Sequence, residues 1–489
     1  MNVNLLTDFP DRLSPMLVKE LRQGMRARGF IMVFLGLQGL LAFILLTTGA
    51  SFDSDGAGTA ASGTIFTMFS IAVLGIQPMR GANALSSEIT SNTIEMMALT
   101  RLSAWRIVFG KWIAIVSQSA LLLATIIPYL ILRYFFGGMN LLGEMVFLAL
   151  IFLSSMALTA VMVGFSATTS KLARVLPVFG LVMLGNLVPS FLFRSSFGSG
   201  MSFFTLSDWH SVVAIACFVI FIAYAGWCAL SYGTSVIAPA AENHSTIRRV
   251  VALVLTLAAA ATGFSADFAT EVTLLLIGGF AVPALITSLT EPAVILPPVC
   301  YPFLKRGLLG RIAGAFFLPG WPTGVFYSCI LIGIGMAGFT ISISTHSAGM
   351  VNPDIPLACL SSLGIILLPA TLAAFFSKQE DKRFTNFMLF LVSSLVLTIA
   401  TMVISEISDD HSLLWSVVWN PSTILFMREV GGFNADDLIV AAILTNCFYM
   451  GALILAAIKR FREYRRVFTE TEIGMLGNDQ LVPATVTDP

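Results

Sequence analysis

The residues best suited to chemistry lie in one polar segment between two long apolar runs, at positions 80–111. Glu88 and Glu95 are seven residues apart, so on a helix they share one face. A short apolar patch follows directly, and charges beside exposed apolar side chains favour contact with another protein rather than catalysis. We therefore expect this segment to dock on a partner. The candidate contact residues, which include the Gly-Lys pair opening the next apolar run, are Glu88, Thr93, Glu95, Met96, Arg101, Gly110 and Lys111.

Other reactive residue types are scattered along the chain. The six cysteines and four histidines show no short pair spacing, which argues against a disulfide framework, a zinc site or a histidine metal cluster. No Gly-rich loop ends in Gly-Lys-Ser or Gly-Lys-Thr, so we do not expect ATP to bind by that route. The sequence therefore predicts no metal, no cofactor and no catalytic site in this chain.

The composition limits the class of protein that carries this segment. Hydrophobic residues fill 57% of the 489 positions and charged residues only 11%, against about 25% charged residues in soluble proteins. So few charges cannot cover the surface of a soluble protein. The 27 basic residues balance 27 acidic ones, so no basic excess favours nucleic acid. We expect an all-α polytopic membrane protein, because long apolar runs argue against a barrel.

About twelve apolar runs have the roughly 20 residues that a helix needs to cross a bilayer. The ninth run contains a Pro-Gly-Trp-Pro sequence at 319–322, which predicts a short helix and a kink near its start. The predicted spans are 30–48, 61–79, 107–132, 142–166, 175–193, 209–231, 250–264, 272–290, 313–342, 355–376, 384–404 and 437–458.

The basic residues predict the orientation of these spans. With both termini on the cytoplasmic side, 24 of the 27 basic residues fall inside, and only Arg133, Arg194 and Arg428 fall outside. We therefore expect N-in, C-in topology and a multi-pass location in the plasma membrane, which in a bacterium is the inner membrane.

The chain also reads as two six-span halves, at 1–250 and 251–489. In each half an acidic residue leaves the second span, and a Gly-plus-base pair opens the third about 20 residues later. In the second half these residues are Glu291 and the Gly310-Arg311 pair. Six spans per half predict parallel repeats, related about an axis along the membrane normal.

Two further segments have amphipathic character. Ser14-Pro15 is a typical helix start, and Leu17, Leu21 and Met25 follow at four-residue spacing beside a basic stripe. This pattern predicts a helix lying on the inner leaflet. The outer segment 405–436 contains an apolar stretch, 413–427, that is too short to span and is broken at Asn420-Pro421. It predicts an interfacial or re-entrant element.

These features together resemble the permease subunits of ATP-binding-cassette exporters, in the type-2 export class. Those subunits begin with an amphipathic interfacial helix. After their second span they carry a Glu, a Thr-x-Glu element, an apolar patch and a Gly-Lys pair. The residues of this chain that match are Glu88, Thr93, Glu95, Gly110 and Lys111.

The resemblance covers about residues 14–250, and beyond them it rests on the span pattern, Glu291 and Gly310-Arg311. The family usually has Gly where this chain has Asn92, and often a Pro in the turn at 100–103. The resemblance implies separate nucleotide-binding ATPase subunits that hold ATP and magnesium. Either one chain forms a pseudo-dimer, or two copies form a homodimer.

The leading hypothesis is thus the membrane subunit of an ATP-driven exporter that works by alternating access. The alternative is a twelve-span secondary transporter, which generally keeps ionisable residues at midmembrane. None stands at the centre of a predicted span, where polarity is limited to amides and hydroxyls such as Gln38, Gln118, Asn186 and Asn446. A membrane-embedded hydrolase needs clustered His, Asp or Glu, and the sequence shows no such cluster. The substrate is not identified by these residues.

Overall fold

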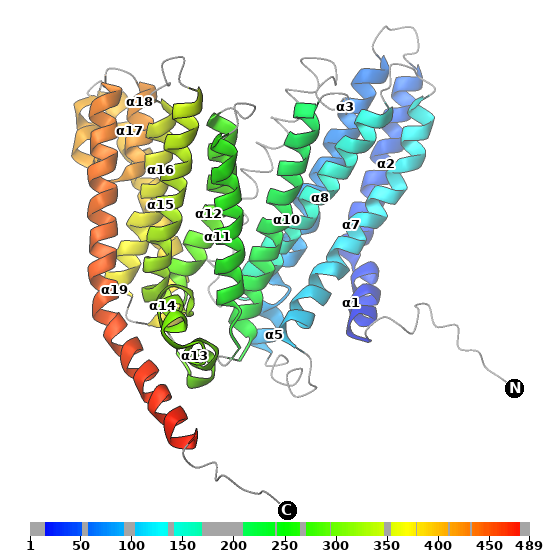
Figure 1. The fold of residues 1–489 in the computed structure, drawn as a ribbon. Coiled ribbons are helices and arrows are strands. Elements are labelled where there is room, and N and C mark those ends of the chain that lie inside the picture. The colour runs from blue at the N-terminus through cyan, green and yellow to red at the C-terminus, as the bar shows by residue number, and fades with distance from the viewer. Residues whose placement is uncertain are drawn as a thin grey trace, which may run out of the picture. The chain divides into compact units, whose positions relative to one another are not determined.

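The chain is an all-α polytopic membrane protein (Figure 1). Within the part described by the structure, a computed structural model, eleven helices are long and apolar enough to cross a membrane. They coincide with eleven of the twelve predicted spans, and the twelfth, at 175–193, lies outside the described residues. The described residues are 15–50, 57–91, 103–134, 141–168, 209–239, 242–264, 270–293, 295–346, 354–377, 379–408, 411–430 and 433–479.

The chain divides into two compact units, Met1–Ala238 (unit 1) and Pro239–Pro489 (unit 2). The division falls before the predicted boundary at 250, because helix α11 (Ser245–Ala261) runs through that position. Five of the described spans belong to unit 1 and six to unit 2.

Unit 1 opens with α1 (Pro15–Arg26), which begins at the predicted proline. Helix α2 (Arg28–Ala50) follows after one residue and exposes large apolar side chains, with Met32 and Leu46 each 74% exposed. Such a surface is covered by lipid in a membrane protein. The later spans are α7 (Ala104–Tyr134), α8 (Leu141–Phe165) and α10 (Trp209–Ile237).

The second span of unit 1 is a series of short helices. It runs through α3 (Ala57–Ser70), the π-helical η1 (Ile71–Ile76), α4 (Gln77–Met79), η2 (Arg80–Asn83) and α5 (Ser86–Thr90). The Ser155 hydroxyl on α8 donates to the Val73 carbonyl at 2.7 Å, which satisfies a backbone group in the π-helical turn. The continuous helical segment extends to Thr90, eleven residues beyond the predicted end of the span at 79.

Helices α8 and α10 pack closely because small residues face each other. A Cβ added to Gly164 would lie 2.1 Å from the Ala229 carbonyl oxygen, and one added to Gly233 would lie 2.8 Å from the Gly164 Cα. Small residues that let two backbones approach are typical of helix pairs in membranes.

We expect Gly164→Val to destabilise unit 1 by about 2–3 kcal/mol, because the new side chain would meet backbone that cannot move aside. Gly36→Val is the matched control, since nothing lies within 4 Å of a Cβ at Gly36. Thermal unfolding in detergent, followed by tryptophan fluorescence, should show a clearly lower unfolding midpoint for the Gly164 variant and an unchanged midpoint for the Gly36 variant. Equal midpoints would contradict close packing of α8 on α10.

Unit 2 contains the spans α11 with η4 (Thr262–Phe264), α12 (Thr270–Thr290), α15 (Trp321–His346), α16 (Asp354–Phe376), α17 (Arg383–Ser408) and α19 (Ala435–Asp479). Between α12 and α15 lie two short helices, α13 (Pro297–Leu304) and α14 (Gly307–Phe317). The chain breaks between α14 and α15, where Gly320 has a φ of +114°. The predicted short helix and kink are therefore confirmed.

The segment after α17 forms two short helices, η6 (His411–Val417) and α18 (Pro421–Val430). They separate at Asn420, which is fully buried and donates to the Ser394 carbonyl at 2.8 Å and to Thr398 Oγ1 at 3.0 Å. The predicted break at Asn420-Pro421 is confirmed, while the headgroup-level position of this element stays a prediction.

Helix α19 is 45 residues long. At 1.5 Å per residue it measures about 67 Å, roughly twice the thickness of a hydrocarbon core. Its C-terminal part reaches α13 and α14, where Phe468 packs against the buried Val299, Cys300 and Leu318. The α13–α14 pair is thus held from two sides of unit 2, by the spans that flank it and by α19.

Candidate functional site

Lys111 joins three helices of unit 1. It lies in the second turn of α7 and is 6% exposed. Its Nζ is 2.8 Å from Glu88 Oε1 on α5 and 3.4 Å from Glu20 Oε1 on α1. The carboxylate side chains are also largely buried, at 14% and 20% exposed. We call Lys111, Glu88 and Glu20 the Lys111 cluster; its shared ammonium links α1, α5 and α7.

The Lys111 cluster joins two residues of the predicted contact segment that are far apart in the sequence, Glu88 and Lys111. Glu88 lies in the first part of that segment and Lys111 at its end, and the structure brings them into direct contact. Gly110 has open space where a Cβ would stand, so packing does not require glycine there. The remaining candidate residues lie outside the described residues; they are Thr93, Glu95, Met96 and Arg101.

Sequence reasoning alone misses Glu20. It is the only acidic residue between Pro15 and Arg26, in a helix that otherwise carries basic charges. A single acid in such a helix is a poor signal for a buried basic partner, because it can equally pair with basic residues three or four positions away on its own helix.

Arg80 provides a second link between α1, the composite span and α7. Its guanidinium donates to the Gln118 side-chain oxygen on α7, to Gln77 Oε1 at 3.4 Å and to the Gly24 carbonyl at 3.5 Å. A Cβ on Gly24 would lie 2.1 Å from the Gln118 amide nitrogen, so α1 approaches α7 closely at this point. Midspan Gln118 therefore serves contact between helices, as do Gln38, which donates to Thr125, and Asn446, which donates to the Leu360 carbonyl.

A second buried ion cluster surrounds Glu291 in unit 2. Arg249 Nη2 lies 2.7 Å from Glu291 Oε2, and Arg248 pairs with the other carboxylate oxygen. The two arginines stand near the start of α11 and are 2% and 1% exposed. The Gly320 N–H also donates to Glu291 Oε2, at 3.2 Å. We call Glu291, Arg248 and Arg249 the Glu291 cluster.

The surroundings of Glu291 keep it ionised. Burial alone would raise its pKa, but the positive charges of Arg249 and Arg248 and hydrogen bonds from Ser245 and the Gly320 N–H outweigh burial, so the pKa of Glu291 is lowered. A depressed carboxylate pKa contributes stability at neutral pH, and that contribution is lost as the pH falls through the folded-state pKa.

Arg249 also holds the end of α14. Its Nη1 donates to the carbonyls of Phe316 at 2.9 Å and Leu318 at 2.8 Å, and its Nη2 donates to the Gly320 carbonyl at 2.9 Å. The last carbonyls of a helix lack partners within the helix and carry partial negative charge, so a buried cation is well placed there. One arginine thus joins α11, Glu291 and the break between α14 and α15.

The positions of Arg248 and Arg249 differ from the prediction. The charge pattern places both on the cytoplasmic side, directly before a seventh span that starts at 250. In the structure the helix begins at Ser245, and the arginines face the interior of unit 2. Charge counting could not find this, because a buried arginine and a surface arginine look alike in a sequence.

Arg383 adds a third buried guanidinium to this part of unit 2. Its guanidinium carbon lies 3.9 Å from the ring centre of Trp321, the first residue of α15. Its Nε donates to the Leu289 carbonyl at 3.2 Å. Trp321 and Leu289 flank the link that contains α13 and α14. Both ends of that link are therefore fixed by buried cations.

Arg311, the predicted counterpart of Lys111, has a different environment. Its side chain is 51% exposed and pairs with Glu472 on α19, not with Glu291. The acidic residue and the following base form one ion pair in unit 1, whereas in unit 2 each has other partners. The resemblance between the halves in this motif does not extend to the contacts that the residues make.

Within the described residues, no group of three or more His, Cys, Asp or Glu side chains could hold a metal ion. No protein family, curated protein or solved structure matches the chain. The class that the described residues define is therefore a multi-pass, all-helical membrane protein with buried ion clusters next to two of its interhelical links.

Proposed function

We propose that this chain is the membrane-spanning permease subunit of an ATP-driven exporter. A separate nucleotide-binding ATPase would hydrolyse ATP, and the chain would move a substrate of unidentified class by alternating access. The observation that carries the proposal is the Glu88–Lys111 ion pair, which joins the two ends of the predicted contact segment. Because this ion pair joins the two sides of the segment, a displacement of the segment would be transmitted to α5 and α7.

The connections of the Lys111 cluster support this role. A displacement of residues 92–102 would reach α5 through Glu88, α7 through Lys111 and α1 through Glu20. In unit 2 the corresponding link carries α13 and α14, anchored by Arg249 and by α19. Both links lie between the second and third spans of their units, where the type-2 exporters place their contact with the ATPase.

The proposal predicts that an ATP-binding-cassette ATPase copurifies with the tagged chain from native membranes and hydrolyses ATP in the complex. Glu95→Lys is the informative variant, because Glu88→Lys would also break the Lys111 cluster. We expect Glu95→Lys to reduce ATPase binding or coupling more than tenfold, as charge reversal at a partly desolvated contact costs several kcal/mol. Measurements are copurification by mass spectrometry and ATP hydrolysis in proteoliposomes.

Glu470→Lys is the matched control. Glu470 is exposed on α19 and its pair with Arg466 is a surface pair, so its reversal should leave complex formation unchanged. Full binding and full coupling in Glu95→Lys, at normal expression, would contradict docking through the segment. Absence of any copurifying ATPase, with the chain intact, would contradict the proposed function itself.

A further inference from the structure

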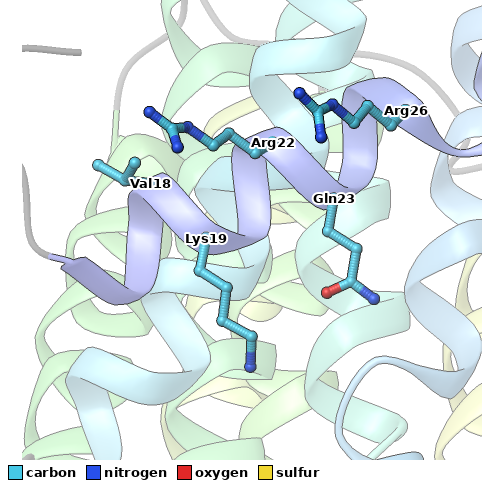
Figure 2. Close-up of a pocket in the computed structure, with 5 residues that line it drawn as sticks. All are labelled: Val18, Lys19, Arg22, Gln23 and Arg26. Atoms are coloured by element: carbon cyan, nitrogen blue, oxygen red, sulfur yellow. The ribbon is translucent and has the colours of Figure 1, made fainter. Parts of the chain in front are cut away.

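The exposed polar side chains of α1 do not converge on one site. Figure 2 shows that Arg22 and Arg26 extend from one side of the helix, while Lys19 and Gln23 extend from another. All four are exposed and belong to a single helix. Polar side chains of unit 1 that lie at one level on neighbouring helices are found in its interior instead, between the second span and α8.

Two contacts fix the register between the second span and α8. The Ser155 hydroxyl donates to the Val73 carbonyl at 2.7 Å. Eight residues further along each helix, a Cβ added to Gly81 would lie 3.0 Å from Val163 Cγ2. The residues midway between the two contacts, about one helical turn from each, therefore lie at the same level on facing sides of the two helices.

Gln77 and Thr159 are these midway residues, and both are 0% exposed. The Gln77 side-chain oxygen accepts from Arg80, but the Gln77 amide nitrogen and the Thr159 hydroxyl have no hydrogen-bond partner in the described part of the chain. The same is true of two further buried hydroxyls, those of Ser70 on α3 and Ser119 on α7. Because a membrane interior supplies no water, each such group costs about 1–3 kcal/mol. Four of them in one unit point to a polar molecule that binds there.

The chemistry of these groups indicates the class of that molecule. A side-chain amide nitrogen donates and a hydroxyl both donates and accepts, so the groups suit hydroxyl or amide groups of a ligand. None of the four is charged, whereas a buried charged ligand needs an opposite charge beside it. Arg80, three residues after Gln77, would repel a cation. Its guanidinium already donates to Gln118 and Gly24, so it is not available to an anion.

We propose that Gln77 and Thr159 belong to a binding site inside unit 1 for an uncharged molecule that carries hydroxyl or amide groups. That this molecule is the exported substrate rests on the proposed function, whereas the site itself does not. The second span is suited to open and admit a ligand, because the π-helical turn η1 ends directly before Gln77 and such turns are frequent at functional sites.

Cysteine accessibility tests the site in the purified full chain without any ATPase, so its failure and that of the proposed function are distinguishable. One cysteine is placed at Thr159 or at Ala160 after the six native cysteines are replaced, and the chain is reconstituted in liposomes. The probe is 2-hydroxyethyl methanethiosulfonate, which is uncharged and carries a hydroxyl. Ala160 is the matched control, because it is 1% exposed on the same helix but packs in an apolar cluster. We expect Thr159→Cys to react about tenfold faster than Ala160→Cys, because a thiol among apolar side chains meets neither the reagent nor the water that ionises it.

Two comparisons separate a polar binding site from general access. Gln77→Leu, added to Thr159→Cys, removes a hydrogen-bonding group from the site and should slow the reaction about tenfold. Gln38→Leu, at a glutamine that already donates to Thr125, should leave the rate unchanged. The cationic reagent 2-(trimethylammonium)ethyl methanethiosulfonate should react about tenfold more slowly at Thr159→Cys, once each rate is divided by that of the same reagent with free 2-mercaptoethanol.

Elution of every variant as a single species controls for folding. The proposal is overturned if Thr159→Cys reacts no faster than Ala160→Cys, because the interior of unit 1 would then be sealed and hold at most ordered water. It is also overturned if Gln77→Leu leaves the rate unchanged, or if the cationic reagent reacts as fast as the uncharged one.

Discussion

Replacing Lys111 with Met is expected to lower the stability of unit 1 by about 3 kcal/mol. The substitution leaves Glu88 and Glu20 as two largely buried carboxylates without the ammonium between them. Removing one partner of a buried ion pair costs about 3–5 kcal/mol, and we take the lower end because the carboxylates retain some exposure. Thermal unfolding in detergent and the yield of monodisperse protein measure the effect.

Arg311→Met is the matched comparison, because the sequence places Arg311 in the corresponding position of the second half. Its pair with Glu472 is exposed, and such pairs contribute about 0–1 kcal/mol. Glu88→Gln/Lys111→Met should be less destabilised than the sum of its single changes, since the two residues are in contact. If Lys111→Met and Arg311→Met lower stability equally, the Lys111 cluster does not stabilise unit 1 as the structure implies.

Much of the fold could be predicted from the sequence because a bilayer imposes simple rules. Length and apolarity are enough to find the spans. A Pro-Gly-Trp-Pro sequence cannot continue a helix, so the break before α15 was also predictable, as was the break at Asn420. The composite second span was not predictable, because the Val73 carbonyl in its π-helical turn is bonded by Ser155, which lies far away in the sequence.

The candidate site could be predicted only in part, for a related reason. Glu88 and Lys111 stand out because they flank a polar segment between two apolar runs. The partners of Glu291 could not be predicted, since three-dimensional packing decides that Arg248 and Arg249, rather than Arg311, reach it. Periodicity reports which residues share a face, but it does not report which faces meet.

Arg249→Met is expected to have the largest effect of any single change in unit 2, on the order of 5 kcal/mol. It removes one of the two buried arginines that pair with Glu291; loss of a buried partner costs about 3–5 kcal/mol, and we take the lower end because Arg248 still pairs with the carboxylate. It also removes the Arg249 donor from the Phe316 carbonyl, and a buried carbonyl that loses its partner costs about 1–3 kcal/mol. The carbonyls of Leu318 and Gly320 lose Arg249 as well but keep the Thr323 hydroxyl as a donor. Partial relaxation at the α14–α15 break reduces the sum.

A loss of this size would lower the yield of folded protein, so a graded series keeps the prediction measurable. Arg249→Lys retains the charge but cannot reach all of these acceptors at once, and should lose about half as much as Arg249→Met. Arg248→Met/Arg249→Met/Glu291→Met removes every charge of the Glu291 cluster and should recover part of the stability of the single variant, because apolar replacement of a whole buried ion cluster is often tolerated. Arg460→Met, at a half-exposed arginine of the same unit, should lose less than about 1 kcal/mol. The series is read from unfolding midpoints and from limited proteolysis of the α14–α15 break. A triple variant no more stable than Arg249→Met would show that Arg249 acts through the carbonyls at the α14–α15 break and that its pair with Glu291 adds nothing.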